Sequence, residues 1–108
     1  MKKGDIILIP FPFSDFTSFK TRPALVLVCD TYDVTVAFIT SKVVKQDIND
    51  IEVKPTTDNG LKADSIIKLN KLATIDKSLA LGELGNLTAN DLKEVDKKLL
   101  AVFAISIK

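Results

Sequence analysis

The pattern of apolar and polar positions predicts several short strands followed by one helix. Apolar runs that are typical of buried strands occur at residues 5–9, 24–29 and 34–39. Turn residues at 30–33 make the second and third of these a hairpin. A short alternating strand is expected at 51–54, a turn at 58–60, and one or two strands over 65–76.

Breaks in this pattern predict where the strands end. The prolines in 10–12 cannot donate ladder hydrogen bonds, so the first strand should leave the sheet there or lie at an edge. A polar loop is expected over 14–21, closed by Arg22 and Pro23, and the glycines within 82–85 predict another turn.

A helix is predicted after Thr88, which suits the N-cap and has Asp91 three residues on. Leu87 and Leu92 occupy the two positions of a hydrophobic staple, and Glu94 and Lys98 are spaced as an i,i+4 ion pair. The stripe that should face the core consists of Leu92, Val95, Leu99 and Val102. The order of elements predicts a mainly β (α+β) fold, a small barrel of short antiparallel strands with a C-terminal helix.

Length and charge narrow the class of protein. A chain of 108 residues is expected to form a single domain, residues 1–108. No apolar run approaches the roughly 20 residues of a membrane span, and the lone Cys29, which we interpret as a core residue, cannot form an internal disulfide. We therefore expect a cytoplasmic protein. A net charge of +1 argues against binding of nucleic acid through a positive field of the whole molecule, but not against a local basic groove.

The residue types exclude several kinds of chemistry. The chain has no histidine, which removes the commonest general base and zinc ligand, and it has no Gly-rich phosphate loop or CxxC pair. No metal or cofactor is expected. Arg22 is the only arginine, so it alone can supply a planar fork of permanent positive charge.

Motifs along nearly the whole chain, in the same order, resemble the PemK/MazF-like toxins. The matching segments are Gly4–Ile9 with Arg22–Leu27, then Phe38–Lys42, Gly60–Ser65, Thr74–Lys77 and Leu84–Thr88. The resemblance implies an SH3-like barrel that acts as a homodimer and cleaves single-stranded RNA at short sequences. It also implies a cognate antitoxin whose tail covers the RNA groove. Contact with operator DNA is expected only through the antitoxin complex, and no membrane is involved.

RNA can be cut without metal when its 2′-hydroxyl attacks the adjacent phosphate, which requires a base, charge stabilisation and a proton for the leaving oxygen. Arg22 suits charge stabilisation, because a guanidinium group binds two phosphate oxygens at once. The resemblance also implies a part for Arg22 in proton transfer, and it makes Thr40 a ligand of the phosphate or of the attacking hydroxyl. Relatives carry Glu, Gln or His in the loop before the arginine, where this chain has Thr17 to Phe19. Asp15 is the only nearby carboxylate.

Several residues are candidates for RNA binding around this pair. Phe16 and Phe19, flanked by polar residues, suit stacking on unpaired bases, whereas Phe11 and Phe13 are expected in the core or a dimer interface. The remaining candidates are Thr17, Lys20, Ser41, Lys42, Lys45 and, where some relatives place an Arg and an Asp, Lys68 and Asn70.

Two other functions remain open from the residues alone. One is a non-enzymatic, CcdB-like toxin that traps DNA gyrase, and the other is a nucleic-acid-binding module that has lost catalysis. The segments Arg22-Pro23 and Ile39–Ser41 favour the nuclease, and the missing loop acid keeps the binding module open.

Overall fold

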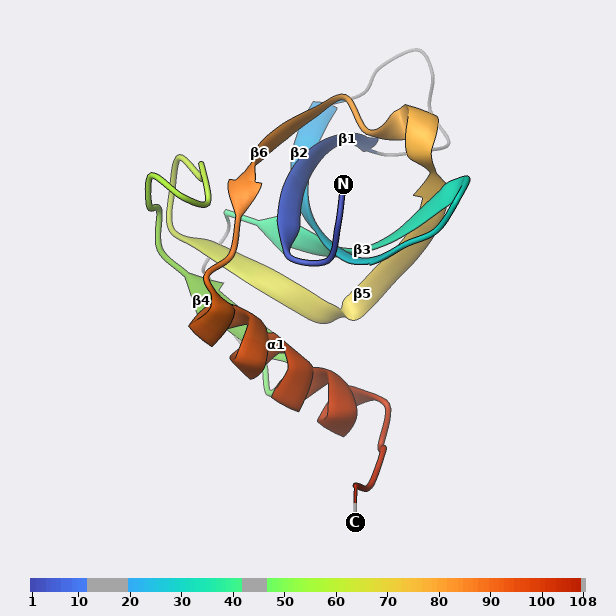
Figure 1. Ribbon diagram of the computed structural model, residues 1–108. Coiled ribbons are helices and arrows are strands. Elements are labelled where there is room, and N and C mark those ends of the chain that lie inside the picture. Colours follow the sequence, from blue (N-terminus) through green and yellow to red (C-terminus); the bar gives the residue numbers. More distant parts are fainter. Residues whose placement is uncertain (12–19, 42–46, 108) are drawn as a thin grey trace.

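In the part of the chain that the structure describes, six antiparallel strands form one curled sheet, and a helix packs against one side of it (Figure 1). This computed structural model describes residues 1–11, 20–41 and 47–107. The order of strands across the sheet is β4-β5-β3-β2-β1-β6. The elements are β1 (Asp5–Phe11), β2 (Lys20–Cys29), β3 (Asp33–Thr40), β4 (Asp50–Val53), β5 (Ser65–Asp76), the 3₁₀ helix η1 (Lys77–Leu79), β6 (Gly82–Asn86) and α1 (Ala89–Val102). The expected mainly β fold with a C-terminal helix is confirmed.

The curled sheet is apolar on both faces, which is why its strands are continuous apolar runs in the sequence. Neighbouring residues point to opposite faces. Ile6 and Leu25 belong to the cluster that α1 covers through Val95, whereas Ile7 and Ala24 belong to the cluster on the other face. Cys29 packs at the margin of this second cluster, half-buried at the end of β2.

The first two strands are longer than the apolar pattern predicts, and this places the arginine in the sheet. β2 begins at Lys20, so the expectation that Arg22 and Pro23 close a loop is wrong. β1 continues to Phe11 and does not leave the sheet at Pro10. It pairs with β6 only as far as Leu8, so Pro10 lies at an edge on that side, as its missing N–H requires.

In the second half of the chain, one expectation is corrected and one alternative is decided. The glycines at 82–85 do not form a turn, because they lie inside β6 and pair with β1. The stretch 65–76 is one strand, interrupted where its pairing with β3 shifts between Ala37 and Phe38. The hairpin of β2 and β3 and the turn at 58–60 are confirmed.

The helix begins as predicted, with the Thr88 side chain accepting a hydrogen bond from the Asp91 backbone N–H at 3.2 Å. The predicted stripe, together with Leu87, packs in the core cluster under α1. The predicted Glu94–Lys98 pair is wrong. Lys98 donates to the backbone carbonyl of Ile48 instead, and Glu94 approaches Lys97. Among the described residues, no helix has the length and apolar character needed to cross a membrane.

Candidate functional site

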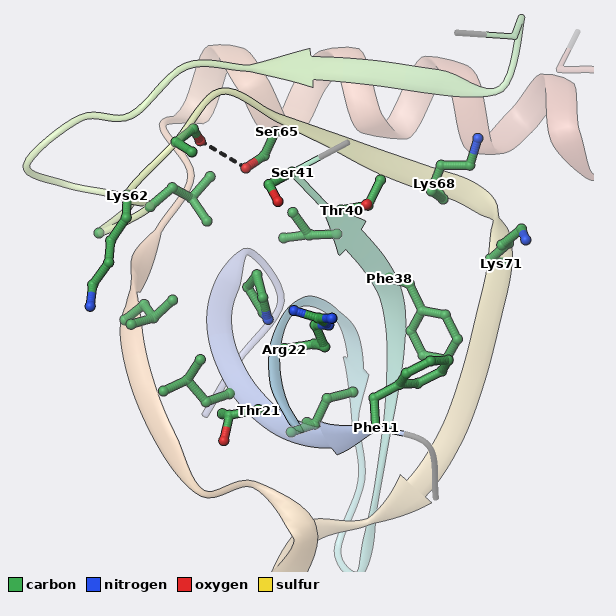
Figure 2. Close-up of a pocket in the computed structure, with 18 residues that line it drawn as sticks. Phe11, Thr21, Arg22, Phe38, Thr40, Ser41, Lys62, Ser65, Lys68 and Lys71 are labelled. Carbon is green, nitrogen blue, oxygen red and sulfur yellow. Dashed lines mark hydrogen bonds between the residues drawn. The ribbon is translucent and has the colours of Figure 1, made fainter. Parts of the chain in front are cut away.

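A groove of about 790 Å³ opens at the edge of the sheet where β1 and β3 end and β2 begins. Its floor comes from these strands, and its sides come from β5 and from the segment after the turn at 58–60 (Figure 2). The polar residues among the 18 that line it are Thr21, Arg22, Thr40, Ser41, Lys62, Ser65, Lys68 and Lys71.

Strand alternation puts Arg22 and Thr40 on the same face of the sheet, on the floor of the groove. Arg22 lies opposite Ile9 of β1, and pairing of β2 with β3 begins at Ala24 opposite Phe38. Arg22 and Thr40, the last residue of β3, each lie two residues from this pair, so strand alternation puts their side chains on the same face as those of Ala24 and Phe38. Figure 2 shows Arg22 at the centre of the groove with Thr40 above it.

The groove is electropositive although the molecule is nearly neutral. The ionisable side chains among its described lining residues are Arg22, Lys62, Lys68 and Lys71, with no carboxylate. Within the described part of the chain, Arg22, Lys62 and Lys71 form no ion pair. Cations that have no carboxylate partner in the described part of the groove are suited to a polyanion.

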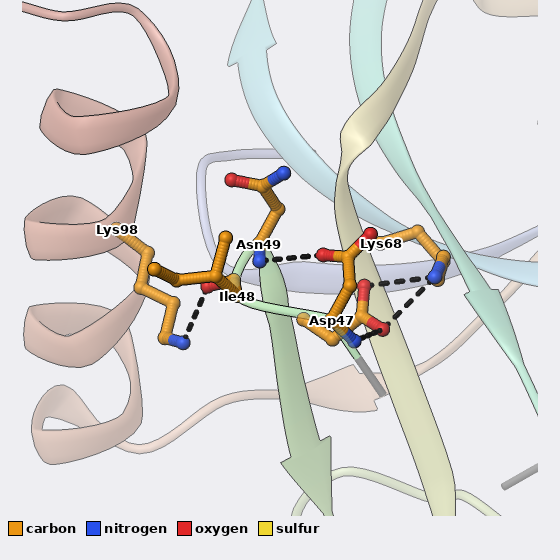
Figure 3. Close-up of polar contacts among 6 residues, drawn as sticks. Asp47, Ile48, Asn49, Lys68 and Lys98 are labelled. Carbon is orange, nitrogen blue, oxygen red and sulfur yellow. Dashed lines mark hydrogen bonds and ion pairs between the residues drawn. The ribbon is translucent and has the colours of Figure 1, made fainter. Parts of the chain in front are cut away.

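The fourth cation, Lys68, is held by a buried carboxylate (Figure 3). Asp50 on β4 lies opposite Lys68 on β5, and the Lys68 Nζ is 2.9 Å from each Asp50 carboxylate oxygen. The Asp50 side chain is 0% exposed and that of Lys68 is 19% exposed. The backbone N–H of Asp47 donates to Oδ2, while Oδ1 has no hydrogen bond of good geometry among the described residues. Lys68 therefore compensates the burial of this charge.

A glycine-dependent contact fixes the side of the groove that carries Lys62. Gly60 has a φ of +68°, and a Cβ there would lie 2.2 Å from the carbonyl oxygen of Leu84. A Cβ on Gly85 would lie 2.1 Å from the carbonyl oxygen of Asp58. The turn and β6 can therefore touch only because both positions lack a side chain.

The same turn is stabilised from inside by Asn59, which is 2% exposed. Its Oδ1 accepts hydrogen bonds from the backbone N–H groups of Thr56 and Leu61, and its Nδ2 donates to the carbonyl of Lys54. Because these bonds satisfy the buried amide, the segment that follows leaves the turn in one direction, which places Lys62 beside the groove.

Residues 2–103 match the model of a family described as the PemK-like, MazF-like toxin of type II toxin–antitoxin systems. The chain belongs to this family. A probable endoribonuclease MazF of Mycolicibacterium smegmatis is 29% identical over 91 residues, which cover 81% of this chain and 84% of that protein. The expectation of a PemK/MazF-like toxin is thus confirmed.

Solved structures of MazF proteins share the fold of this toxin. The Mycobacterium tuberculosis toxin MazF-mt6 superposes with a TM-score of 0.78 at 22% identity, over 95% of this chain and 99% of that chain. An endoribonuclease of mycobacterial species, solved in complex with its cognate antitoxin, gives a TM-score of 0.78 at 13% identity, over 100% and 99%. At these identities the structures show a common fold, and the chemistry must be argued from the groove.

The structure brings together some of the toxin's predicted site residues. Arg22, Thr40, Ser41 and Lys68 line the groove, whereas Lys20 and Asn70 are exposed and are not part of its described lining. Four predicted site residues lie outside the described residues: Phe16, Thr17, Phe19 and Lys42. The other candidates that lie outside them are Phe13, Asp15 and Lys45.

Other groove residues of the toxin were missed from the sequence. They are Lys62, which lies within the matching segment Gly60–Ser65, and Lys71. Asp50, which lies behind the groove in a short strand and pairs with Lys68, was missed as well. Phe11 does not lie in the core, because it is 41% exposed and lines the groove, and its expected place in a dimer interface stays a prediction. No cluster of three or more potential metal ligands occurs among the residues that the structure describes.

Proposed function

We propose that this toxin is a metal-independent endoribonuclease that cleaves single-stranded RNA at short sequences in the groove. The observation that carries the proposal is that Arg22 and Thr40, from neighbouring strands, line one groove whose described ionisable residues are all cations. The relatives named as endoribonucleases, and the fold shared with them, support it.

The reaction uses the RNA's own nucleophile. The 2′-oxygen bonds to the adjacent phosphorus while the bond from phosphorus to the 5′-oxygen breaks, which leaves a 2′,3′-cyclic phosphate and a 5′-hydroxyl. The extra negative charge that develops on the phosphate oxygens is stabilised by the guanidinium of Arg22, which can donate to two oxygens at once. Thr40, at the end of β3, positions the phosphate or the attacking hydroxyl through its side-chain oxygen.

The reaction also needs a group that takes the proton from the 2′-hydroxyl and one that protonates the leaving oxygen. The described lining offers only Arg22 and three lysines as ionisable groups. Asp50, the nearest described carboxylate behind the groove, is fully buried against Lys68 and does not reach substrate. The proton acceptor is therefore expected outside the described lining, and Asp15, which precedes β2 in the sequence, is the candidate that the sequence offers.

The decisive experiment is cleavage of a mixed-sequence RNA in excess EDTA by the purified toxin and by Arg22→Ala, with the cut ends mapped. Discrete cuts that leave 5′-hydroxyl ends are expected from the wild type. Arg22→Ala should cut about 100-fold more slowly or worse, because it loses the donors to the developing charge. Lys93→Ala, on the exposed side of α1, is the matched control and should cut like the wild type.

Three results would contradict the proposal: cutting that requires added metal, 5′-phosphate ends, or full activity in Arg22→Ala. If a folded wild type free of antitoxin cuts none of many RNA sequences, a CcdB-like gyrase inhibitor or a binding module without catalysis becomes the better account. Retained toxicity of Arg22→Ala in cells would favour the gyrase inhibitor.

The same proposal covers partners and location. We expect a single cytoplasmic domain over residues 1–108 that acts as a homodimer. A cognate antitoxin is expected to cover the groove with an acidic segment, since the described groove carries unpaired cations. Relatives solved with their antitoxins, from mycobacterial species and from Deinococcus radiodurans, support this expectation.

A further inference from the structure

One side of the groove combines an exposed ring, Phe11, and a half-buried ring, Phe38, with a lysine whose charge is balanced by a buried carboxylate. Phe38 on β3 lies opposite Lys68 on β5, and Phe11 meets Phe38 edge-on, with 5.5 Å between ring centroids. Phe11 is 41% exposed. Figure 2 shows Phe11, Phe38, Lys68 and Lys71 on the same side of the groove, with Arg22 at its centre.

Lys68 differs from the other groove cations in its electrostatics. Asp50 lies within 2.9 Å through both carboxylate oxygens, so the pair brings no net charge to the groove. An ammonium group has three donors, and two carboxylate oxygens engage at most two of them. At least one N–H remains without a carboxylate partner, and Lys68, whose side chain is 19% exposed, is one of the residues that line the groove.

We propose that Phe11, Phe38 and Lys68 form a base-recognition subsite. An unpaired RNA base stacks on the aromatic pair, and Lys68 donates a hydrogen bond to a carbonyl oxygen on the edge of the base. Asp50 is a positioning residue, which fixes the Lys68 donor and removes its attraction for phosphate. This inference rests on the RNA binding proposed above, and it adds which part of the groove reads sequence.

The chemistry of the subsite favours some bases over others. Aromatic rings stack on any base, so stacking supplies affinity without discrimination. The hydrogen bond from Lys68 supplies the discrimination, because uracil, guanine and cytosine carry a carbonyl oxygen and adenine carries none. A neutral ion pair attracts a phosphate only weakly, whereas Lys71, beside it and without an ion pair among the described residues, suits the backbone.

The test measures base preference and salt dependence in the same variants. Base preference comes from sequencing the cut sites in a random RNA pool. Salt dependence comes from binding of an RNA oligomer whose 2′-hydroxyl at the cut site is replaced by hydrogen, so that binding is read without cleavage. The variants are Asp50→Asn, the double variant Asp50→Asn with Lys68→Gln, and Lys71→Ala. Because Asp50 is buried, thermal melting of each variant first establishes that it folds.

Asp50→Asn and Lys71→Ala are expected to change the salt dependence of RNA binding in opposite directions. Asp50→Asn frees the charge of Lys68, so the slope of log affinity against log salt should steepen by about 0.7. At the same time the discrimination against adenine at one position should fall about fivefold. The double variant should lose that discrimination while keeping the wild-type slope. Lys71→Ala should flatten the slope by about 0.7 and leave the base preference unchanged.

Other results would overturn the subsite. If the double variant flattens the slope and keeps the base preference, Lys68 contacts phosphate. If Asp50→Asn weakens cutting equally at all sites with no change of slope, the pair only stabilises the sheet. A wild type that neither binds nor cuts RNA refutes the proposed function itself, whereas one that cuts with a base preference unmoved by these variants refutes only the subsite.

Discussion

At the scale of single residues, Asp76 gives a pH dependence whose sign follows from one hydrogen bond. Its Oδ1 accepts from the Ser78 backbone N–H at 2.8 Å at the start of η1. This bond, together with the Ser78 side chain, holds the pKa of Asp76 below its ordinary value of 3.8. The ionised form is therefore favoured in the folded state. Its contribution to stability is complete above 3.8 and is lost as the pH falls through the lower, folded pKa.

We expect Asp76→Ala to melt at a lower temperature than the wild type near neutral pH, and the difference to shrink as the pH falls below 3.8. Thermal melts monitored by circular dichroism over this range measure the effect. Asp64→Ala is the matched control, because the Asp64 side chain is exposed and makes no hydrogen bond among the described residues. A melting difference between Asp76→Ala and wild type that stays constant into acid would contradict the assignment.

Also at this scale, the sequence marked the arginine of the groove more readily than its lysines. Arg22 is the only arginine, so any need for a guanidinium group pointed to it. Of the 15 basic residues the other 14 are lysines, and most lysines are simply solvated. Lys62 and Lys71 could be selected only after the turn at 58–60 and the irregular part of β5 had been placed beside β3, because these contacts are distant in sequence.

At the scale of elements, β6 contains two glycines with opposite tolerance for a side chain. A Cβ on Gly85 would meet the Asp58 carbonyl oxygen at 2.1 Å, whereas one on Gly82 would meet only Leu8 Cδ1, at 4.0 Å. Gly85→Ala should therefore lower the free energy of unfolding by about 2 kcal/mol or more, since backbone must move to relieve the clash. Gly82→Ala should change it by less than about 0.5 kcal/mol.

Urea unfolding of the two variants, monitored by circular dichroism, measures this difference. The pair is well matched, because both substitutions add one methyl group to the same strand. Equal stability of the two variants would show that the turn at 58–60 can withdraw from β6 without loss. Because that turn leads to Lys62, Gly85→Ala should also weaken RNA binding, and Gly82→Ala should not.

The two glycines also show which secondary-structure elements cannot be predicted from local sequence patterns. Apolar runs and the Thr88 cap are local signals, and they predicted the central strands and the start of α1 correctly. Glycines usually mark turns, so 82–85 was assigned to one. The reason for glycine here is the close approach of a segment 27 residues earlier (Asp58 to Gly85), which no local window contains.

At the scale of the whole molecule, the sheet order explains how a small chain forms an open groove. The β2–β3 hairpin follows from the sequence pattern, but β6 pairs with β1 and joins residues near the two ends of the chain. This pairing stops at Leu8, while β1 and β2 continue beyond it. The ends of these strands therefore carry Phe11 and Arg22 past the region covered by β6, where a ligand can reach them.

The whole molecule is nearly neutral, but its groove is positively charged, and this predicts how strongly RNA binding depends on salt. The net charge is +1, so we expect single-stranded RNA to bind through the groove cations that form no ion pair among the described residues, which are Arg22, Lys62 and Lys71. Each phosphate neutralised on a single strand contributes about −0.7 to the slope of log affinity against log salt, so a slope of about −2 per protomer is expected. Lys62→Ala should reduce its magnitude by about 0.7. Lys93→Ala changes the net charge equally but lies on α1, so it should leave the slope unaltered. Equal effects of the two variants would mean that RNA responds to the overall charge, and the groove would then not be where it binds.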